Sequence, residues 1–149
     1  MREEFSDSLR VVLDKAQQAA RSLNRDFVGV EHLMLGVLEC SECEAAQALR
    51  RGEVPFDDLR MALLDDLPRG GETPVVTGNL PLTPKAMRVV NEAVVHAQQA
   101  RQQRVSTRML LTALLDERDS AVRQALGAAG ADVEHLRRVL GEAPVAAEQ

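Results

Sequence analysis

The chain has 149 residues, of which 45% are hydrophobic and 28% charged, and its formal net charge at pH 7 is −5. A chain of this length can form one compact domain with a sizeable core, and this composition is that of an ordinary globular protein. The negative charge and an aromatic content of only 2% argue against nucleic-acid binding, which normally needs a basic surface and stacking aromatic rings.

The first half of the chain predicts four helices. Ser6 is a favourable N-cap for a long first helix ending near Leu23, and shorter helices are expected over about residues 30–39 and 43–50 and from Pro55 to before Pro68. Gly36 costs about 1 kcal/mol relative to alanine inside a helix, so we expect it to permit a close helix contact. The residues at helical spacing in the first helix are Leu9, Val12, Leu13, Ala16, Ala20 and Leu23.

The second half of the chain predicts four more helices. Residues 68–81 are rich in turn formers and form the expected linker. Thr83 is then a second N-cap, with Pro84 at the first helical position. Shorter helices are expected over about residues 107–116, 120–129 and 132–140. The residues expected to mark the long helix are Met87, Val90, Ala93, Val94, Ala97 and Ala100.

The two halves are copies of one another. Residues 28–38 return in altered form as residues 105–115, and the same offset of 77 residues aligns the chain without a gap from about residue 5 to Leu63. Such a register indicates a tandem duplication. We predict an all-α fold in which two tandem four-helix repeats form a pseudo-twofold eight-helix bundle. The predicted single domain, 1–149, comprises repeat one (5–67), the linker (68–81), repeat two (82–140) and a tail (141–149).

The repeated stretch resembles a known family. Residues 29–36 read Gly-Val-Glu-His-Leu-Met-Leu-Gly, which is similar to the G-T-E-H-L-L-L-G-L signature of the Clp N-terminal domain, the double repeat at the front of the Clp/Hsp100 protein-unfolding ATPases. The resemblance covers nearly the whole chain. It implies a non-catalytic module that binds protein substrates or adaptors in protein quality control, with a Clp AAA+ ATPase as a partner in cis or in trans. The alternative is a repurposed helical scaffold that has lost the peptide site.

The resemblance also implies a binding site. In some members of the family each repeat holds phosphorylated arginine between a hydroxyl at the start of the long helix and the Glu of the Glu-His signature. Carried over to this chain, the first site would pair Ser6 with Glu31. The second would pair Thr83 with Arg108, where a cation replaces the expected carboxylate and would repel a guanidinium. We therefore expect a degenerate second site and at most one working pocket. Unfolded segments are the other ligands that the resemblance implies.

The sequence lacks the common catalytic motifs. It contains no G-x-x-x-x-G-K-[ST], H-E-x-x-H or G-x-S-x-G, so we expect no enzyme and no cofactor. Cys40 and Cys43 form a C-x-x-C motif, but no strand pattern surrounds it and the three histidines fall in separate segments. Two thiols in a turn between helices are the expected reading, and no metal is expected. A thiol-based sensor is a third hypothesis for function.

The expected location is the cytoplasm. No apolar run approaches the length of about 20 residues that spans a bilayer. Residues 1–4 are not followed by the apolar core of a signal peptide. We therefore expect neither a membrane nor a nucleic acid among the partners.

Overall fold

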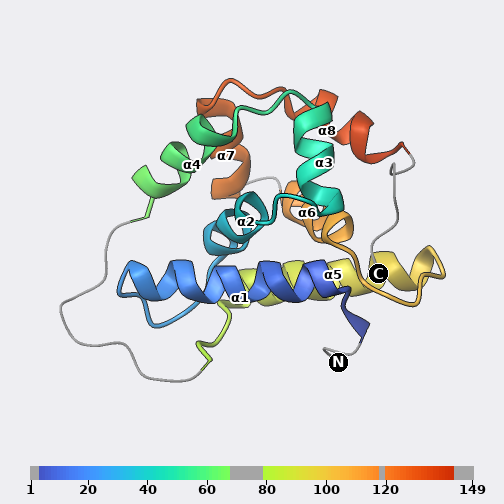
Figure 1. Ribbon diagram of the computed structural model, residues 1–149, viewed down its shortest axis with the longest axis horizontal. Coiled ribbons are helices and arrows are strands. Elements are labelled where there is room, and N and C mark those ends of the chain that lie inside the picture. Colours follow the sequence, from blue (N-terminus) through green and yellow to red (C-terminus); the bar gives the residue numbers. More distant parts are fainter. Residues whose placement is uncertain (1–3, 68–78, 118–119, 143–149) are drawn as a thin grey trace.

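The computed structural model describes residues 4–67, 79–117 and 120–142, and these residues form eight α-helices. In Figure 1 the long helices α1 and α5 lie on one side of the molecule, α2 and α6 lie in the middle, and the remaining four lie on the opposite side. The helices are α1 (Asp7–Ser22), α2 (Val30–Glu39), α3 (Glu44–Arg51), α4 (Phe56–Asp65), α5 (Pro84–Gln99), α6 (Thr107–Asp116), α7 (Ala121–Ala128) and α8 (Val133–Leu140).

The two repeats are related by an approximate twofold axis. Helix α1 packs on α2 as α5 packs on α6, and α3 contacts α8 as α7 contacts α4. The same correspondence extends to the turns, because Asn24 and Arg101, which occupy equivalent positions, have positive φ angles of 55° and 56°. Glu53 and Gly130 form a second such pair, with φ angles of 59° and 83°. The all-α pseudo-twofold bundle expected from the duplication is therefore confirmed.

The predicted N-caps begin both long helices. The Ser6 hydroxyl accepts a hydrogen bond from the Leu9 amide at 3.0 Å, and the Thr83 hydroxyl accepts one from the Ala86 amide at 3.0 Å. Each bond satisfies an amide that the first turn of a helix leaves without an intrahelical partner. Pro84 is the first residue of α5, where its fixed φ angle favours the helix.

The core consists almost entirely of aliphatic side chains. Two of the positions predicted for the long second-repeat helix differ, because Met87 is 50% exposed and Ala100 is also exposed, while Ala86 and Val89 are buried. The buried face of α5 includes the expected Val90, Ala93 and Ala97, and it begins at Ala86 and Val89 in place of Met87. The largest fully buried side chains are Leu9, Leu33, Met34, Leu49, Leu59, Leu63, Leu110, Leu111, Leu114, Leu115, Leu126 and Leu136.

Helices α1 and α2 cross at very short range where Gly36 faces α1. A β-carbon at Gly36 would lie 2.4 Å from the carbonyl oxygen of Val12 and 3.1 Å from the amide nitrogen of Ala16. Both atoms belong to the α1 backbone, so no side-chain rotation could relieve the collision. The close contact expected at Gly36 is therefore present, and only glycine fits there without moving a helix.

Part of the predicted organisation lies outside the described residues. The linker 68–81 includes residues 68–78, and the tail 141–149 includes residues 143–149, none of which the structure describes. Among the residues that are described, no helix is long and apolar enough to cross a membrane.

We predict that Gly36→Ala lowers the free energy of unfolding by about 2 kcal/mol. The intrinsic helix propensity of alanine favours the change by about 1 kcal/mol, but the new methyl group must push α1 away from α2. Urea denaturation at neutral pH measures the difference. The matched control is Gly127→Ala in α7, where a β-carbon meets no atom within 4 Å. That substitution should raise stability by up to about 1 kcal/mol, and equal effects of the two would contradict the steric explanation.

Candidate peptide-binding site

Two short backbone pairings join the starts of helices from different repeats. Phe5 forms an isolated parallel bridge with Val105, and Val28 forms one with Leu82. The Ser6 amide donates to the Val105 carbonyl at 2.9 Å, and the Thr83 amide donates to the Val28 carbonyl at 2.9 Å. The start of each long helix therefore lies beside the segment that leads into the central helix of the other repeat.

This crossing changes the pairing of the predicted site residues. A β-carbon at Gly29 would lie 3.4 Å from Glu31 Oε1 and 3.8 Å from Thr83 Cγ2, so both side chains border the same space. Glu31 thus lies close to Thr83 of repeat two, and Ser6 lies beside the segment that leads into α6. The carried-over pairs, Ser6 with Glu31 and Thr83 with Arg108, assumed sites within one repeat. The structure instead brings together one residue from each.

The two N-cap hydroxyls differ in exposure. Ser6 is fully buried, at 0% exposed, and its hydroxyl is bound to the Leu9 amide. Thr83 is only partly buried, and its methyl group faces the space beside Glu31. Of the two hydroxyl residues predicted for the site, Thr83 is therefore the one that a ligand could reach.

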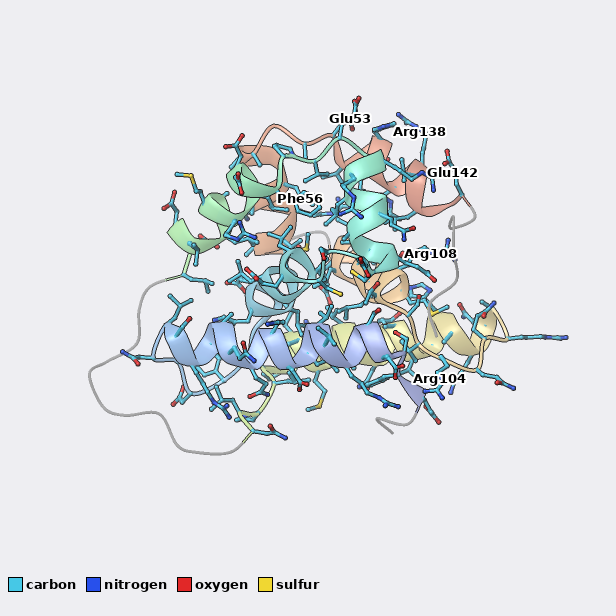
Figure 2. The ribbon with its side chains drawn as sticks, in the orientation of Figure 1. Glu53, Phe56, Arg104, Arg108, Arg138 and Glu142 are labelled. Carbon is cyan, nitrogen blue, oxygen red and sulfur yellow. The ribbon has the colours of Figure 1, made fainter. Side chains whose placement is uncertain are left out.

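Arg108 is held by other parts of the protein. Its guanidinium donates to the carbonyl oxygens of Leu140 at 3.1 Å and Glu142 at 3.0 Å, and it lies 3.6 Å from the carboxylate of Glu44. Glu44 is only 6% exposed, so a negative charge on it needs stabilising partners within the protein. Figure 2 shows Arg108 near α3, with Glu142 at the end of α8. Arg108 thus joins the start of α3 to the end of α8.

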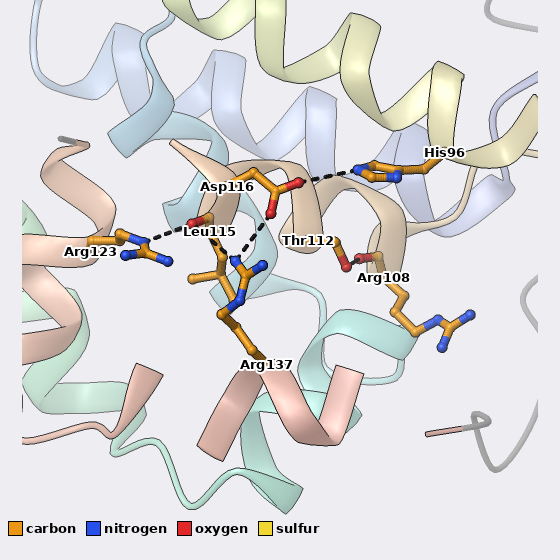
Figure 3. Close-up of polar contacts among 7 residues, drawn as sticks. All are labelled: His96, Arg108, Thr112, Leu115, Asp116, Arg123 and Arg137. Atoms are coloured by element: carbon orange, nitrogen blue, oxygen red, sulfur yellow. Dashed lines mark hydrogen bonds and ion pairs between the residues drawn. The ribbon is translucent and has the colours of Figure 1, made fainter. Parts of the chain in front are cut away.

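Two arginines, one from α7 and one from α8, contact the C-terminal end of α6. The carbonyl oxygen of Leu115 accepts a hydrogen bond from Arg123 at 2.7 Å, and Arg137 is paired with Asp116 at 3.1 Å (Figure 3). Asp116 also lies 3.3 Å from His96 Nε2, which ties α6 to α5. These contacts join helices of repeat two and present no free cation to a ligand.

His32, the second residue of the Glu-His pair, is buried and caps the start of α2. It is 1% exposed, and its Nδ1 accepts a hydrogen bond from the Gly29 amide at 2.9 Å, which closes the first turn of α2. Burial, with a smaller contribution from the positive charge of Arg25, lowers the pKa of His32 from 6.5 to about 4. His32 is therefore neutral at pH 7, and the accepting role of Nδ1 assigns its proton to Nε2. Nε2 has no hydrogen-bond partner within the described part of the chain.

An apolar hollow of about 250 Å³ lies between the repeats. Phe5 and Leu82 occupy equivalent positions of the two repeats, and both line it. The side-chain amide of Gln17 closes one side by exchanging two hydrogen bonds with the Leu80 backbone, at 2.9 and 2.8 Å. The hollow can hold one apolar side chain. Its lining residues are Phe5, Leu13, Asp14, Gln17, Val28, Leu33, Asn79, Leu80, Leu82 and Val90.

The two cysteines lie in the turn between α2 and α3, with Cys40 at the end of α2 and Cys43 at the start of α3. Both are buried free thiols; the Cys43 thiol donates to the Cys40 carbonyl at 3.1 Å, and its sulfur accepts from the Ala46 amide at 3.4 Å. Cys43 thereby caps α3, and its equivalent in repeat two, Ser120, caps α7. Among the described residues no three side chains are grouped as metal ligands. The position of the thiols supports a capping role.

Comparisons with known proteins agree on the fold. A family model described as the Clp repeat (R) N-terminal domain matches residues 4–129 and 96–147. The chain is 31% identical over 140 residues to an ATP-dependent Clp protease ATP-binding subunit ClpA homolog of Trieres chinensis. That alignment covers 94% of this chain and 16% of the relative, so the chain spans about one sixth of the relative's length.

Two solved structures are also similar in fold. The N-terminal domain of the chaperone ClpD from Arabidopsis thaliana superposes with a TM-score of 0.77 at 19% identity, covering 93% of this chain and 92% of that one. A ClpV N-domain solved in complex with a VipB peptide gives a TM-score of 0.71 at 17% identity, with coverages of 93% and 88%.

We predict that the low pKa of His32 makes the protein less stable in acid. The unfolded chain binds a proton at this residue near pH 6.5, whereas the folded protein does so only near pH 4, so stability falls as the pH drops through this interval. The loss from this residue should reach about 3 kcal/mol. Urea denaturation at several pH values between 7 and 4 should show that His32→Gln, which can still accept from the Gly29 amide, lacks this loss. Parallel pH profiles of the two proteins would contradict the assignment.

A second prediction concerns Arg108. Its change to Glu restores the carboxylate of the family signature but places it beside buried Glu44. We expect a loss of about 2 to 4 kcal/mol in the free energy of unfolding and no new binding site. Thermal denaturation measures the loss. Arg88→Glu is the matched control, since Arg88 is an exposed residue of α5 that lies 3.7 Å from Glu117, and its change should cost under about 1 kcal/mol.

Proposed function

Because the chain belongs to the Clp repeat (R) N-terminal domain family, we propose that it is a non-catalytic module that binds protein substrates or adaptors for a Clp-type unfolding and degradation system. The relative from Trieres chinensis is named as the ATP-binding subunit of a Clp protease, and this chain matches a part of it. The sequence has no P-loop, so ATP-driven unfolding would be carried out by a Clp AAA+ ATPase, in cis or in trans.

The binding site that we propose lies between Glu31 and Thr83. The observation that carries this proposal is the cross-repeat pairing, which places the Glu31 carboxylate and Thr83 over the same space at Gly29. The N-terminal ends of α2 and α5 meet there, and each end carries a partial positive charge. A ligand with both an anionic and a cationic group suits this arrangement, because helix N-termini attract the anion and Glu31 attracts the cation.

Phosphoarginine is the ligand of this kind that we propose. Its phosphoryl group would lie at the start of α5 near Thr83, and its guanidinium nitrogens would lie at the Glu31 carboxylate. Ser6 was the hydroxyl first expected in this role, but it is fully buried and its hydroxyl is bound to the Leu9 amide. The proposal therefore replaces Ser6 by Thr83.

The apolar hollow between the repeats supports binding of a peptide. Val28 and Leu82 line the hollow, and each lies next to the segment that carries Glu31 or Thr83. An apolar side chain next to the modified arginine could enter the hollow, and the same space would accept one from an unfolded segment. The similar ClpV N-domain, solved with a VipB peptide, is consistent with peptide binding on this fold.

We propose one working site of this kind. The residue equivalent to Glu31 is Arg108, whose guanidinium is held by Glu44 and by the end of α8. The same observation favours the second candidate function, a helical scaffold that has lost its peptide site. We place the protein in the cytoplasm, where reducing conditions would keep Cys40 and Cys43 as thiols.

The test is a calorimetric titration of a phosphoarginine peptide, beside its unphosphorylated twin, into the protein. We expect binding of about one peptide per chain, and a loss of affinity of at least about tenfold in Glu31→Gln, because the neutral amide no longer attracts the guanidinium. Thr83→Val, which keeps the shape of the side chain but removes the hydroxyl, should also weaken binding.

Glu92→Gln is the matched control, because it makes the same change of charge at an exposed residue in the middle of α5. Its affinity should equal that of the unchanged protein. Failure of the phosphoarginine peptide to bind the folded protein would overturn the phosphoarginine site and favour the scaffold.

A further inference from the structure

A groove of about 460 Å³ runs between α4 and α7, on the side of the molecule opposite α1 and α5 (Figure 1). Its floor is formed by small side chains, because α7 presents Ala121, Ala125 and Ala128 along one face. Helix α4 contributes Met61, which is 63% exposed and is the most exposed large apolar side chain among the described residues. The lining residues are Asp58, Met61, Ala62, Asp65, Asp66, Ala121, Gln124, Ala125 and Ala128.

The charge in this groove is of one sign. Its charged lining residues are Asp58, Asp65 and Asp66, and no basic side chain lines it. None of these three carboxylates has a hydrogen bond or ion pair with another described residue. A ligand that carries positive charge would therefore meet three carboxylates that need no rearrangement to receive it.

The approximate twofold axis relates this groove to an equivalent surface, where an arginine of the protein itself is paired with the carboxylate. The equivalent surface lies between α8 and α3, and there Arg51 of α3 forms an ion pair with Glu142. The positions equivalent to Arg51 and Glu142 are Ala128 and Asp65. The α4–α7 groove thus keeps the carboxylate of this pair but lacks the arginine.

We propose that the α4–α7 groove binds an arginine-bearing peptide segment of a protein partner. The guanidinium takes the place at Asp65 that Arg51 takes at Glu142, and an apolar side chain next to it packs on Met61. Methionine suits such a contact because its flexible, polarisable side chain adapts to different partners. An arginine that carries a phosphoryl group is disfavoured here, since its negative charge would face the aspartates.

This second surface does not depend on the Glu31–Thr83 site. Its residues come from α4 and α7, whereas Glu31 and Thr83 lie at the starts of α2 and α5. The unmodified arginine of one segment and the phosphorylated arginine of another would therefore be bound at separate places on the domain. Substitutions at either place test one site without altering the other.

The probe is a fluorescently labelled amphipathic peptide with two arginines and two leucines at helical spacing, titrated by fluorescence anisotropy at low salt. We expect saturable binding that falls by about fivefold or more in Asp65→Asn. Ala128→Arg should abolish binding, because it supplies the missing arginine from within the protein. Its thermal unfolding should match or exceed that of the unchanged protein, which shows that the loss does not reflect misfolding.

Asp57→Asn is the matched control. Asp57 lies on the same helix as Asp65 but does not line the groove, and its carboxylate lies 3.2 Å from Arg60. The Asp57→Asn variant makes the same change in net charge as Asp65→Asn and should leave the affinity unchanged. Equal losses in Asp57→Asn and Asp65→Asn would overturn the proposal in favour of diffuse charge attraction. Unchanged binding by Ala128→Arg, or no binding by the unchanged protein, would also overturn it.

Discussion

The structure depends on the two backbone pairings that cross between the repeats. Each pairing joins the segment before a long helix to the segment before a central helix, through hydrogen bonds of 2.9 Å from the Ser6 and Thr83 amides. An isolated bridge of this kind adds little stability by itself. Its importance is positional, because it fixes where four helices begin relative to one another. The space beside Glu31 exists because residues from both repeats are brought to it.

The helices and the duplication could be predicted from the sequence, because both depend on local information. Apolar spacing and the N-caps at Ser6 and Thr83 determine where helices start, and the Gly36 contact follows from a glycine inside a helix. The error at Met87 shows the limit of spacing alone, since α5 has apolar residues on more than one face. Packing against α6 decides which of those residues is buried.

The arrangement of the site could not be predicted in the same way. Aligning the repeats compares Ser6 with Thr83 and Glu31 with Arg108, and it suggests that each repeat builds its own pocket. A twofold axis that exchanges partners instead gives sites with one residue from each repeat. The sequence also carries no sign that Ser6 would be buried, because Ser6 lies against Val105 of the other repeat.

Differences between the repeats, more than their similarities, decide which surfaces can receive a ligand. At one pair of equivalent positions, repeat one keeps Glu31 while repeat two has Arg108, which joins α3 to α8. At another pair, α3 keeps Arg51, which pairs with Glu142, while α7 has Ala128 and leaves the carboxylate of Asp65 without that partner. In each case an arginine of one copy is paired within the protein, and the other copy lacks the equivalent pair. Duplication followed by such unequal substitution can therefore give one small fold different surfaces at equivalent places, and the two binding surfaces proposed above are of this kind.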